Sequence, residues 1–243
     1  MKCAVYVEGK AEMLFVADVL AKYSDYDPSK IGFKCITLNK DVLKPVSHPA
    51  QGDELSSSSY YQIVNVNNDD LVVSKLKKDI PNLAKQGYEI IIGLRDVFGE
   101  GYKALIQNQE IDLDLIREMH DVQYDQIKND CADIRLHFAI MEYEAWMLAL
   151  IDNFIISKGG NPDSVFKSVG IDYNSDFEKT VFHPYIKVEK IFQSIGEHYG
   201  KHESDYYSFL NTLTKTDYET LRNSNRCVSF KLFIDSLLSI VMR

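Results

Sequence analysis

No apolar run in this sequence of 243 residues approaches the roughly 18 residues that a membrane-spanning helix needs. The chain also lacks an opening basic segment followed by a short apolar core, which is the mark of a secretory signal. Its four cysteines lie far apart without a C-x-x-C pair, which argues against a zinc knuckle and against a dense disulfide framework. We therefore expect a cytoplasmic protein with no membrane partner.

Several catalytic signatures are missing as well. The sequence contains no G-x-x-x-x-G-K-[ST], G-x-G-x-x-G, G-x-S-x-G or H-E-x-x-H segment, which argues against the common NTPase, dinucleotide, α/β-hydrolase and zinc-protease sites. Acidic residues outnumber basic ones, 36 to 27, and the formal net charge is −9. A chain of this charge repels polyanions as a whole, although bound divalent cations can reverse the sign of a local site.

Short apolar runs typical of buried strands alternate with helical patterns over the first part of the chain. The expected strands are Cys3–Val7, Phe33–Leu38, Tyr60–Val66, Tyr88–Leu94 and Ile134–Met141. The expected helices are Ala11–Lys22, Asp69–Gln86, Ala104–Lys128 and Tyr143–Ile151. This alternation predicts an α/β domain over residues 1–155, with a mostly parallel sheet and helices on both faces.

Two regions depart from the alternation. Pro45, Pro49, Gly52 and the serine run 56–59 predict a long polar loop, which could cover a site as a lid. Residues 156–243 contain helical patches but no convincing strand, so we expect a helical extension packed on the α/β domain. Its last helix, Phe230–Val241, has one apolar face, which favours core packing over a dimer interface.

Acidic residues follow three of the expected strands. Glu8 ends the first, Asp96 follows the strand through Leu94, and Glu142 ends the strand through Met141. Glu12, Glu100 and Glu144 stand close behind them. Sites in parallel sheets form at the carboxyl ends of strands, and carboxylates that converge there repel one another unless they bind a cation. Oxygen ligands favour Mg²⁺ or Mn²⁺ over zinc, so the pattern predicts a divalent-metal site.

Each acid also has a purely structural interpretation. In this interpretation Asp96 is simply a turn residue or a helix cap, and Glu12 suits the first turn of any helix because of the helix dipole. Glu142 and Glu144 can be surface carboxylates beside a buried Trp146. His137, within an expected strand, is more often a hydrogen-bonded sheet residue than a catalyst.

Three segments in order give the chain a resemblance to a known family. The segment from Val7 to Glu12, V-E-G-K-A-E, resembles the opening motif of Toprim domains, found in topoisomerases, primases and the overcoming-lysogenisation-defect nucleases. The segment D-V-F-G at residues 96–99 and the segment E-Y-E-A at residues 142–145 resemble those of an uncharacterised Toprim-like family of bacterial, defence-associated proteins. The second aspartate of the usual Asp-x-Asp motif is missing, and Met141 stands where that family usually has histidine.

The resemblance implies roles for these residues. Glu8 would act as acid/base or metal-bridging group, Asp96 and Glu142 as metal ligands, and Glu12 and Glu144 as auxiliary ligands or as acids behind the ligands. Glu100 could replace the missing aspartate. Apart from the resemblance, Lys10 and Arg95 flank the acids and could either contact phosphate or only neutralise the neighbouring charges; Arg95 is the better phosphate candidate because its planar guanidinium binds oxygens in pairs.

The implied function is that of a Mg²⁺- or Mn²⁺-dependent phosphodiester hydrolase, a nuclease of Toprim type, acting on nucleic acid with a partner ATPase in phage defence. The alternative is a catalytically inactive Toprim-derived module that binds a partner or nucleic acid; the missing aspartate, Met141 and the acidic charge favour it. A third option is phosphoryl chemistry on a small nucleotide.

Overall fold

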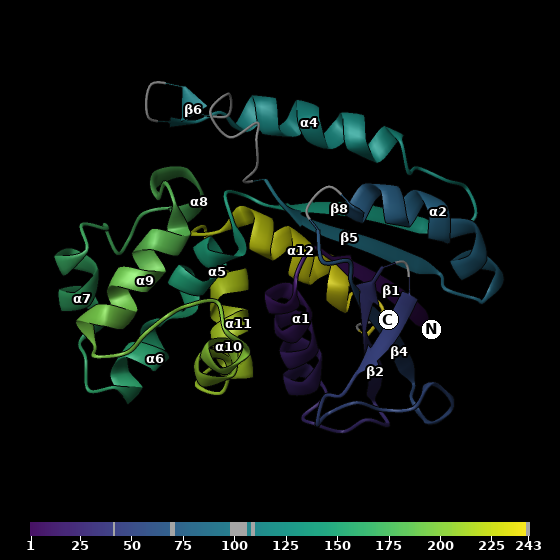
Figure 1. The fold of residues 1–243 in the computed structure, drawn as a ribbon, viewed down its shortest axis with the longest axis horizontal. Helices are drawn as coiled ribbons and strands as arrows, with labels where there is room; N and C mark the ends of the chain where they lie inside the picture. The colour runs from purple at the N-terminus through teal and green to yellow at the C-terminus, as the bar shows by residue number, and fades with distance from the viewer. Residues whose placement is uncertain (41, 69–70, 98–105, 108–109, 242–243) are drawn as a thin grey trace. The chain divides into compact units, whose positions relative to one another are not determined.

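The computed structural model of the chain describes residues 1–40, 42–68, 71–97, 106–107 and 110–241 (Figure 1). The chain forms two compact units. The first comprises Met1–Arg95, Asp114–Phe138 and Leu232–Arg243, and the second comprises Asp96–Leu113 and Ala139–Lys231. The expected boundary near residue 155 stays a prediction.

A six-stranded, mostly parallel sheet with the strand order β3-β2-β4-β1-β5-β8 confirms the predicted α/β class. Strand β1 (Lys2–Val7) runs parallel to both β4 (Ser59–Asn65) and β5 (Ile90–Asp96). Beyond β4, β2 (Ile31–Asn39) is also parallel. Strand β8 (Asp133–Ala139) lies next to β5. Hydrogen bonds from the Asp133 N–H to the Glu89 carbonyl and from the Val97 N–H to the Ala139 carbonyl show that these two strands run the same way.

The prediction of a long polar loop before β4 is partly wrong. Val42–Val46 forms β3, which pairs antiparallel with the outer side of β2, and a short 3-10 helix follows at Glu54–Ser56. This edge strand is mostly exposed, and Lys44 and Pro45 interrupt its short apolar sequence V-L-K-P-V. Pro45 is compatible with it because an edge strand needs ladder hydrogen bonds on one side only.

The predicted helix over Ala104–Lys128 is too long. Helix α4 covers only Leu113–Asp125, and a two-stranded ribbon of β6 (Ile106–Gln107) and β7 (Glu110–Ile111) precedes it. Residues 98–105 and 108–109, with the predicted site residue Glu100, lie outside the described residues. Helix α2 (Leu71–Lys85) continues through Pro81, whose side chain is exposed.

Helices cover both faces of the sheet in the first unit (Figure 1). The hydroxyl of Tyr6 on β1 donates to Asp79 on α2 at 2.8 Å. Tyr61 is in register with Cys3, so it points to the opposite face, where its hydroxyl donates to the carbonyl of Leu237 on α12 (Val228–Leu238) at 2.7 Å. Successive residues of a strand alternate between faces, so Tyr6 and Tyr61 identify the two helical layers. Helix α1 (Lys10–Tyr23) lies on the same side as α12.

The predicted burial of the last helix is confirmed in all but one residue. Phe230, Phe233, Ile234, Leu237 and Leu238 are fully buried, whereas Val241 is 36% exposed. Among the described residues, no helix combines the length and apolarity that crossing a bilayer requires.

The second unit is mainly helical. It contains α5 (Tyr143–Leu150), α6 (Asp152–Ser157), α7 (Pro162–Ser168), α8 (Phe177–Thr180), α9 (Pro184–Ser194), α10 (Glu203–Leu210) and α11 (Lys215–Arg222). Buried Trp146 donates its ring N–H to Glu178 and Ser229, at 3.1 and 3.0 Å. Helix α9 ends at Ser194, and Gly196 just beyond it adopts the left-handed backbone (φ 77°) that is common after helix ends.

Candidate functional site

The predicted site residues are divided between the two units. Glu8, Lys10, Glu12 and Arg95 belong to the first unit, and Asp96, Glu142 and Glu144 to the second.

In the first unit, Glu8 and Glu12 flank the start of α1. Both are nearly buried, at 7% and 6% exposure, and Gly9 between them is the N-cap of the helix. A Cβ added to Gly9 would lie 2.8 Å from Glu12 Oε2, so the carboxylate of Glu12 folds back over the first turn. The partial positive charge of a helix N-terminus favours a carboxylate at this place. Glu12 therefore has a structural role whether or not it binds a metal.

The two predicted phosphate contacts differ in their surroundings. Lys10 is exposed at the first position of α1. Arg95 on β5 donates from Nη1 to Gln123 Oε1 at 3.0 Å, and its guanidinium lies over the ring of Phe138, 5.8 Å from the centroid. These contacts hold the Arg95 side chain against the first unit, and part of its hydrogen-bonding capacity is used there.

In the second unit, Asp96 is joined to the segment that carries Glu142. Asp96 Oδ1 accepts a hydrogen bond of 3.1 Å from the backbone N–H of Tyr143, the first residue of α5. The ends of the neighbouring strands β5 and β8 thus meet at the start of one helix. Asp96 satisfies one of the free N–H groups of that helix, as the structural interpretation of this residue expects.

Glu142 lies at the start of two helices. It is the N-cap of α5, and its Oε2 accepts the N–H of Tyr185, at the start of α9, at 3.1 Å. Its pKa is raised, first by burial and then by the nearby charge of Glu144; Lys201 and the Tyr185 N–H act against this shift. Glu142 consequently holds a proton at higher pH than an ordinary glutamate.

Glu144 is not the surface carboxylate that its structural interpretation describes. Its side chain is buried, and its Oε1 lies 2.7 Å from Lys201 Nζ and accepts the hydroxyl of Tyr199 at 3.0 Å. Lys201 also lies over the ring of Tyr185, 4.8 Å from the centroid. Burial lowers the pKa of Lys201, but the charges of Glu144 and Glu142 together raise it by more than burial lowers it, so the net shift is upward.

No sequence pattern predicted Tyr185, Tyr199 and Lys201 as neighbours of Glu142 and Glu144. They lie in the helical region without a motif, 41 to 59 residues after Glu142 and Glu144 along the chain. Nothing in the local pattern of residues 185–201 marks them as neighbours of the acids, because only the packing of α9 and the segment after it against α5 brings them there.

Two residues with a left-handed backbone lie close in sequence to the two partners of the Glu142–Tyr185 hydrogen bond. Met141 has a left-handed backbone (φ 72°) and is buried, and His183, just before the Pro184-Tyr185 pair, is also left-handed (φ 54°). Bulky residues adopt this conformation only where their surroundings enforce it, and such strain is concentrated at functional sites. The backbone on both sides of the Glu142–Tyr185 hydrogen bond is therefore held in place by the packing of the second unit.

Among the described residues, no group of three or more His, Cys, Asp or Glu side chains is placed to hold a metal ion. The donors that are present fit Mg²⁺ or Mn²⁺ by their chemistry, because Asp96 and Glu142 offer carboxylate oxygens. The repulsion between Glu142 and Glu144 is also the kind of interaction that a cation relieves. Lys201 already supplies that relief to Glu144, so a metal that used Glu144 as a ligand would have to displace it.

Searches with this chain among protein-family models, curated proteins and solved structures found no match. The resemblance to Toprim proteins therefore stays a prediction that rests on the three segments at Glu8, Asp96 and Glu142.

Proposed function

We propose that this chain is a Mg²⁺- or Mn²⁺-dependent phosphodiester hydrolase of Toprim type that acts on nucleic acid. The observation that carries the proposal is the link between Asp96 and the Glu142–Tyr143 segment, which joins acids from the ends of two adjacent parallel strands. Parallel sheets bind ligands at this edge, and the mostly parallel sheet supports the same interpretation.

The chain's own residues would act as follows. Asp96 and Glu142 would hold the metal, and Glu8 would transfer a proton as acid or base. When bound, a divalent ion activates water and stabilises the leaving oxygen of a phosphodiester. Burial and the charge of Glu144 raise the pKa of Glu142, and a bound cation would favour its ionised form. Lys10, exposed at the start of α1, and Arg95, at the end of β5, would contact the phosphate of the substrate.

A second candidate function, a module that binds nucleic acid or a protein partner without cleavage, is favoured by one contact. Lys201 neutralises Glu144 inside the second unit, and a permanent ion pair of this kind stabilises the fold without a metal. The methionine at position 141, where the Toprim-like family has histidine, points the same way.

Cleavage assays separate the two functions. We expect the purified chain to cut plasmid or single-stranded DNA or RNA with Mn²⁺ or Mg²⁺, and expect Glu8→Gln, Asp96→Asn and Glu142→Gln each to lower the rate at least about 100-fold, since each removes a group used in the reaction. Glu118→Gln is the matched control, because Glu118 is exposed on α4 and outside the candidate site. Activity that survives Glu8→Gln would defeat the assignment of that residue.

Calorimetry with Mn²⁺ completes the test. Binding of Mn²⁺ or Mg²⁺ at millimolar concentrations supports the hydrolase if Asp96→Asn and Glu142→Gln abolish it. A folded chain that binds neither Mn²⁺ nor Mg²⁺ is the non-catalytic module. The ATPase partner and the role in phage defence follow from the family resemblance. The cleavage assay can be repeated with ATPases that the chain captures, and the proposal expects cleavage in that mixture to depend on ATP.

A further inference from the structure

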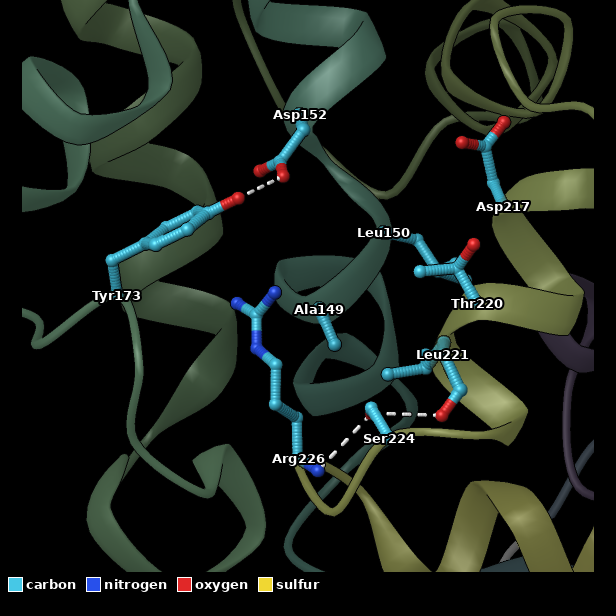
Figure 2. Close-up of a pocket in the computed structure, with 9 residues that line it drawn as sticks. All are labelled: Ala149, Leu150, Asp152, Tyr173, Asp217, Thr220, Leu221, Ser224 and Arg226. Carbon is cyan, nitrogen blue, oxygen red and sulfur yellow. Dashed lines mark hydrogen bonds between the residues drawn. The ribbon is translucent and has the colours of Figure 1, made fainter.

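A cavity of about 150 Å³ lies within the second unit (Figure 2). Its apolar lining comes from Ala149 and Leu150 at the end of α5 and from Leu221 on α11. Its polar lining includes Asp152, Tyr173 and Arg226. None of the acids at the strand ends lines this cavity, so it is separate from the candidate metal site.

Arg226 brings a half-buried positive charge with unused donors to the cavity. Its guanidinium lies between the rings of Tyr173 and Phe177, 4.8 and 4.6 Å from their centroids. Its Nε and Nη2 atoms are buried and, within the part of the chain that the structure describes, have no hydrogen-bond partner. These two N–H groups lie along one edge of the guanidinium and form the fork that grips a carboxylate. Buried N–H groups without acceptors are costly, so a ligand that supplies acceptors to them would be bound favourably.

Asp152 brings the opposite charge. Its Oδ2 accepts the hydroxyl of Tyr173 at 2.5 Å, and its Oδ1 is buried without a hydrogen-bond partner among the described residues. Figure 2 shows the side chain of Arg226 extending toward the carboxylate of Asp152 and the hydroxyl of Tyr173. The cavity therefore presents an unsatisfied acceptor and unsatisfied donors together.

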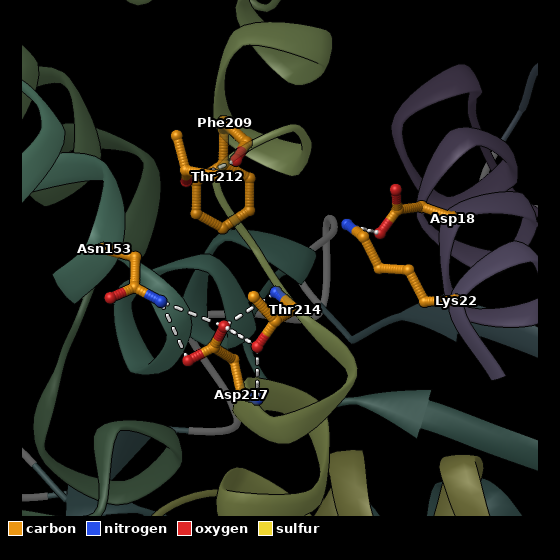
Figure 3. Close-up of polar contacts among 7 residues, drawn as sticks. All are labelled: Asp18, Lys22, Asn153, Phe209, Thr212, Thr214 and Asp217. Atoms are coloured by element: carbon orange, nitrogen blue, oxygen red, sulfur yellow. Dashed lines mark hydrogen bonds and ion pairs between the residues drawn. The ribbon is translucent and has the colours of Figure 1, made fainter. Parts of the chain in front are cut away.

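The remaining lining acid, Asp217, is already satisfied. Its two oxygens accept the side-chain amide of Asn153 at 2.9 and 3.0 Å, and one of them also accepts the N–H and hydroxyl of Thr214 at 2.7 Å (Figure 3). Its charge still matters, because the lining holds two carboxylates and one guanidinium. This balance disfavours a bare anion such as phosphate and favours a ligand that carries both charges.

We propose that this cavity binds a small zwitterion of the α-amino-acid type, with its carboxylate on Arg226 and its ammonium group on Asp152. The size fits, because a cavity of ~150 Å³ accommodates a ligand of about six non-hydrogen atoms, as many as L-alanine has. A nucleotide needs a larger pocket. This inference goes beyond the proposed hydrolase and does not depend on it.

Calorimetry on the full chain tests the proposal with L-alanine as the probe. Sodium acetate and methylammonium chloride, each with one of the two charges, serve as half-probes at the same ionic strength. We expect saturable binding of L-alanine, and binding of each half-probe at least about tenfold weaker, because each leaves one buried charge unsatisfied. Acetate that binds as tightly as alanine would overturn the zwitterion, and so would the absence of alanine binding to the folded chain.

Variants assign the two contacts. Asp152→Asn keeps the shape of the side chain and removes its charge, and Arg226→Lys keeps the charge and removes the fork; each should weaken L-alanine binding at least about tenfold. Glu203→Gln is the control, since it removes a carboxylate charge from an exposed residue that does not line the cavity. Circular dichroism verifies that each variant folds. If Arg226→Lys fails to fold, Asp152→Asn alone decides, and binding of alanine at the wild-type level by that variant would refute the proposal.

Discussion

His137 is a buried titratable group that the structure leaves with an unsatisfied atom. The expectation of a hydrogen-bonded sheet histidine is wrong for Nε2, which is buried and has no hydrogen-bond partner among the described residues. The ring meets Phe233 of α12 edge to face, with 5.7 Å between centroids. Burial, together with the charges of His120 and Arg135, lowers the pKa of His137 to about 4. The residue is therefore neutral in the folded protein at neutral pH.

This pKa predicts that acid destabilises the protein through His137. The unfolded chain binds a proton near pH 6.5 and the folded chain only near 4, so the stabilisation is complete above about pH 6.5 and is lost as the pH falls toward 4. Urea unfolding between pH 7 and 4.5 should show the free energy of unfolding falling by at most about 1.4 kcal/mol per pH unit from this group.

His137→Gln should remove that part of the slope, whereas His198→Gln, which changes an exposed histidine, should leave it in place. Glu178 acts in the opposite direction, because its raised pKa, due mainly to burial, makes the folded state hold its proton more tightly. Only the difference between the variants therefore isolates His137. An unchanged slope in His137→Gln would contradict the assignment.

At the scale of an element, α12 joins the end of the chain to the sheet. Besides the contact with Tyr61, Arg135 on β8 donates to the carbonyl of Ser236 at 3.2 Å and to the hydroxyl of Ser239 at 2.8 Å. Phe233, Ile234 and Leu237 are fully buried on the same helix. Helix α12 is thus part of the core of the first unit.

Replacing one buried leucine of α12 measures this contribution. Leu237→Ala should lower the free energy of unfolding by about 2–5 kcal/mol, because it removes buried methyl groups and leaves a cavity. Leu232→Ala, at a residue 55% exposed on the same helix, should change it by less than about 0.5 kcal/mol. Equal effects of the two substitutions in urea denaturation would mean that this face of α12 is not core.

For the whole molecule, the net charge of −9 sets a condition on the proposed substrate. A polyanion approaches an acidic protein only where the local charge is reversed, and a bound divalent cation can reverse it. Nucleic-acid binding by this chain should therefore depend on the metal as well as on basic residues.

We expect a fluorescent single-stranded DNA to bind in 5 mM Mn²⁺ at about 0.1 M salt and to be released by excess EDTA, because removal of the cation restores the repulsion. Fluorescence anisotropy with the non-cleaving Glu8→Gln variant measures this without loss of substrate. Binding that EDTA leaves unchanged would show that basic side chains alone hold the DNA, which would favour the non-catalytic module.

The local pattern of the sequence predicted the central strands well. Cys3–Val7, Tyr60–Val66 and Tyr88–Leu94 are apolar because they are buried within the sheet, and each coincides with a strand to within about two residues. The edge strand β3 was missed because Lys44 and Pro45 interrupt its apolar residues, and the strands of the ribbon β6-β7 were missed because two residues are too few to show a pattern.

The sequence by itself determined the fold class, the acids that follow the strands and the burial of the last helix, because all three depend on the order of polar and apolar residues along the chain. Only the tertiary structure decided which partners those acids have. Glu144 is paired with Lys201 and Glu142 with Tyr185, and Arg226 shares a cavity with Asp152. Those partners are distant in sequence and come together through helix packing, which leaves no local periodicity to read.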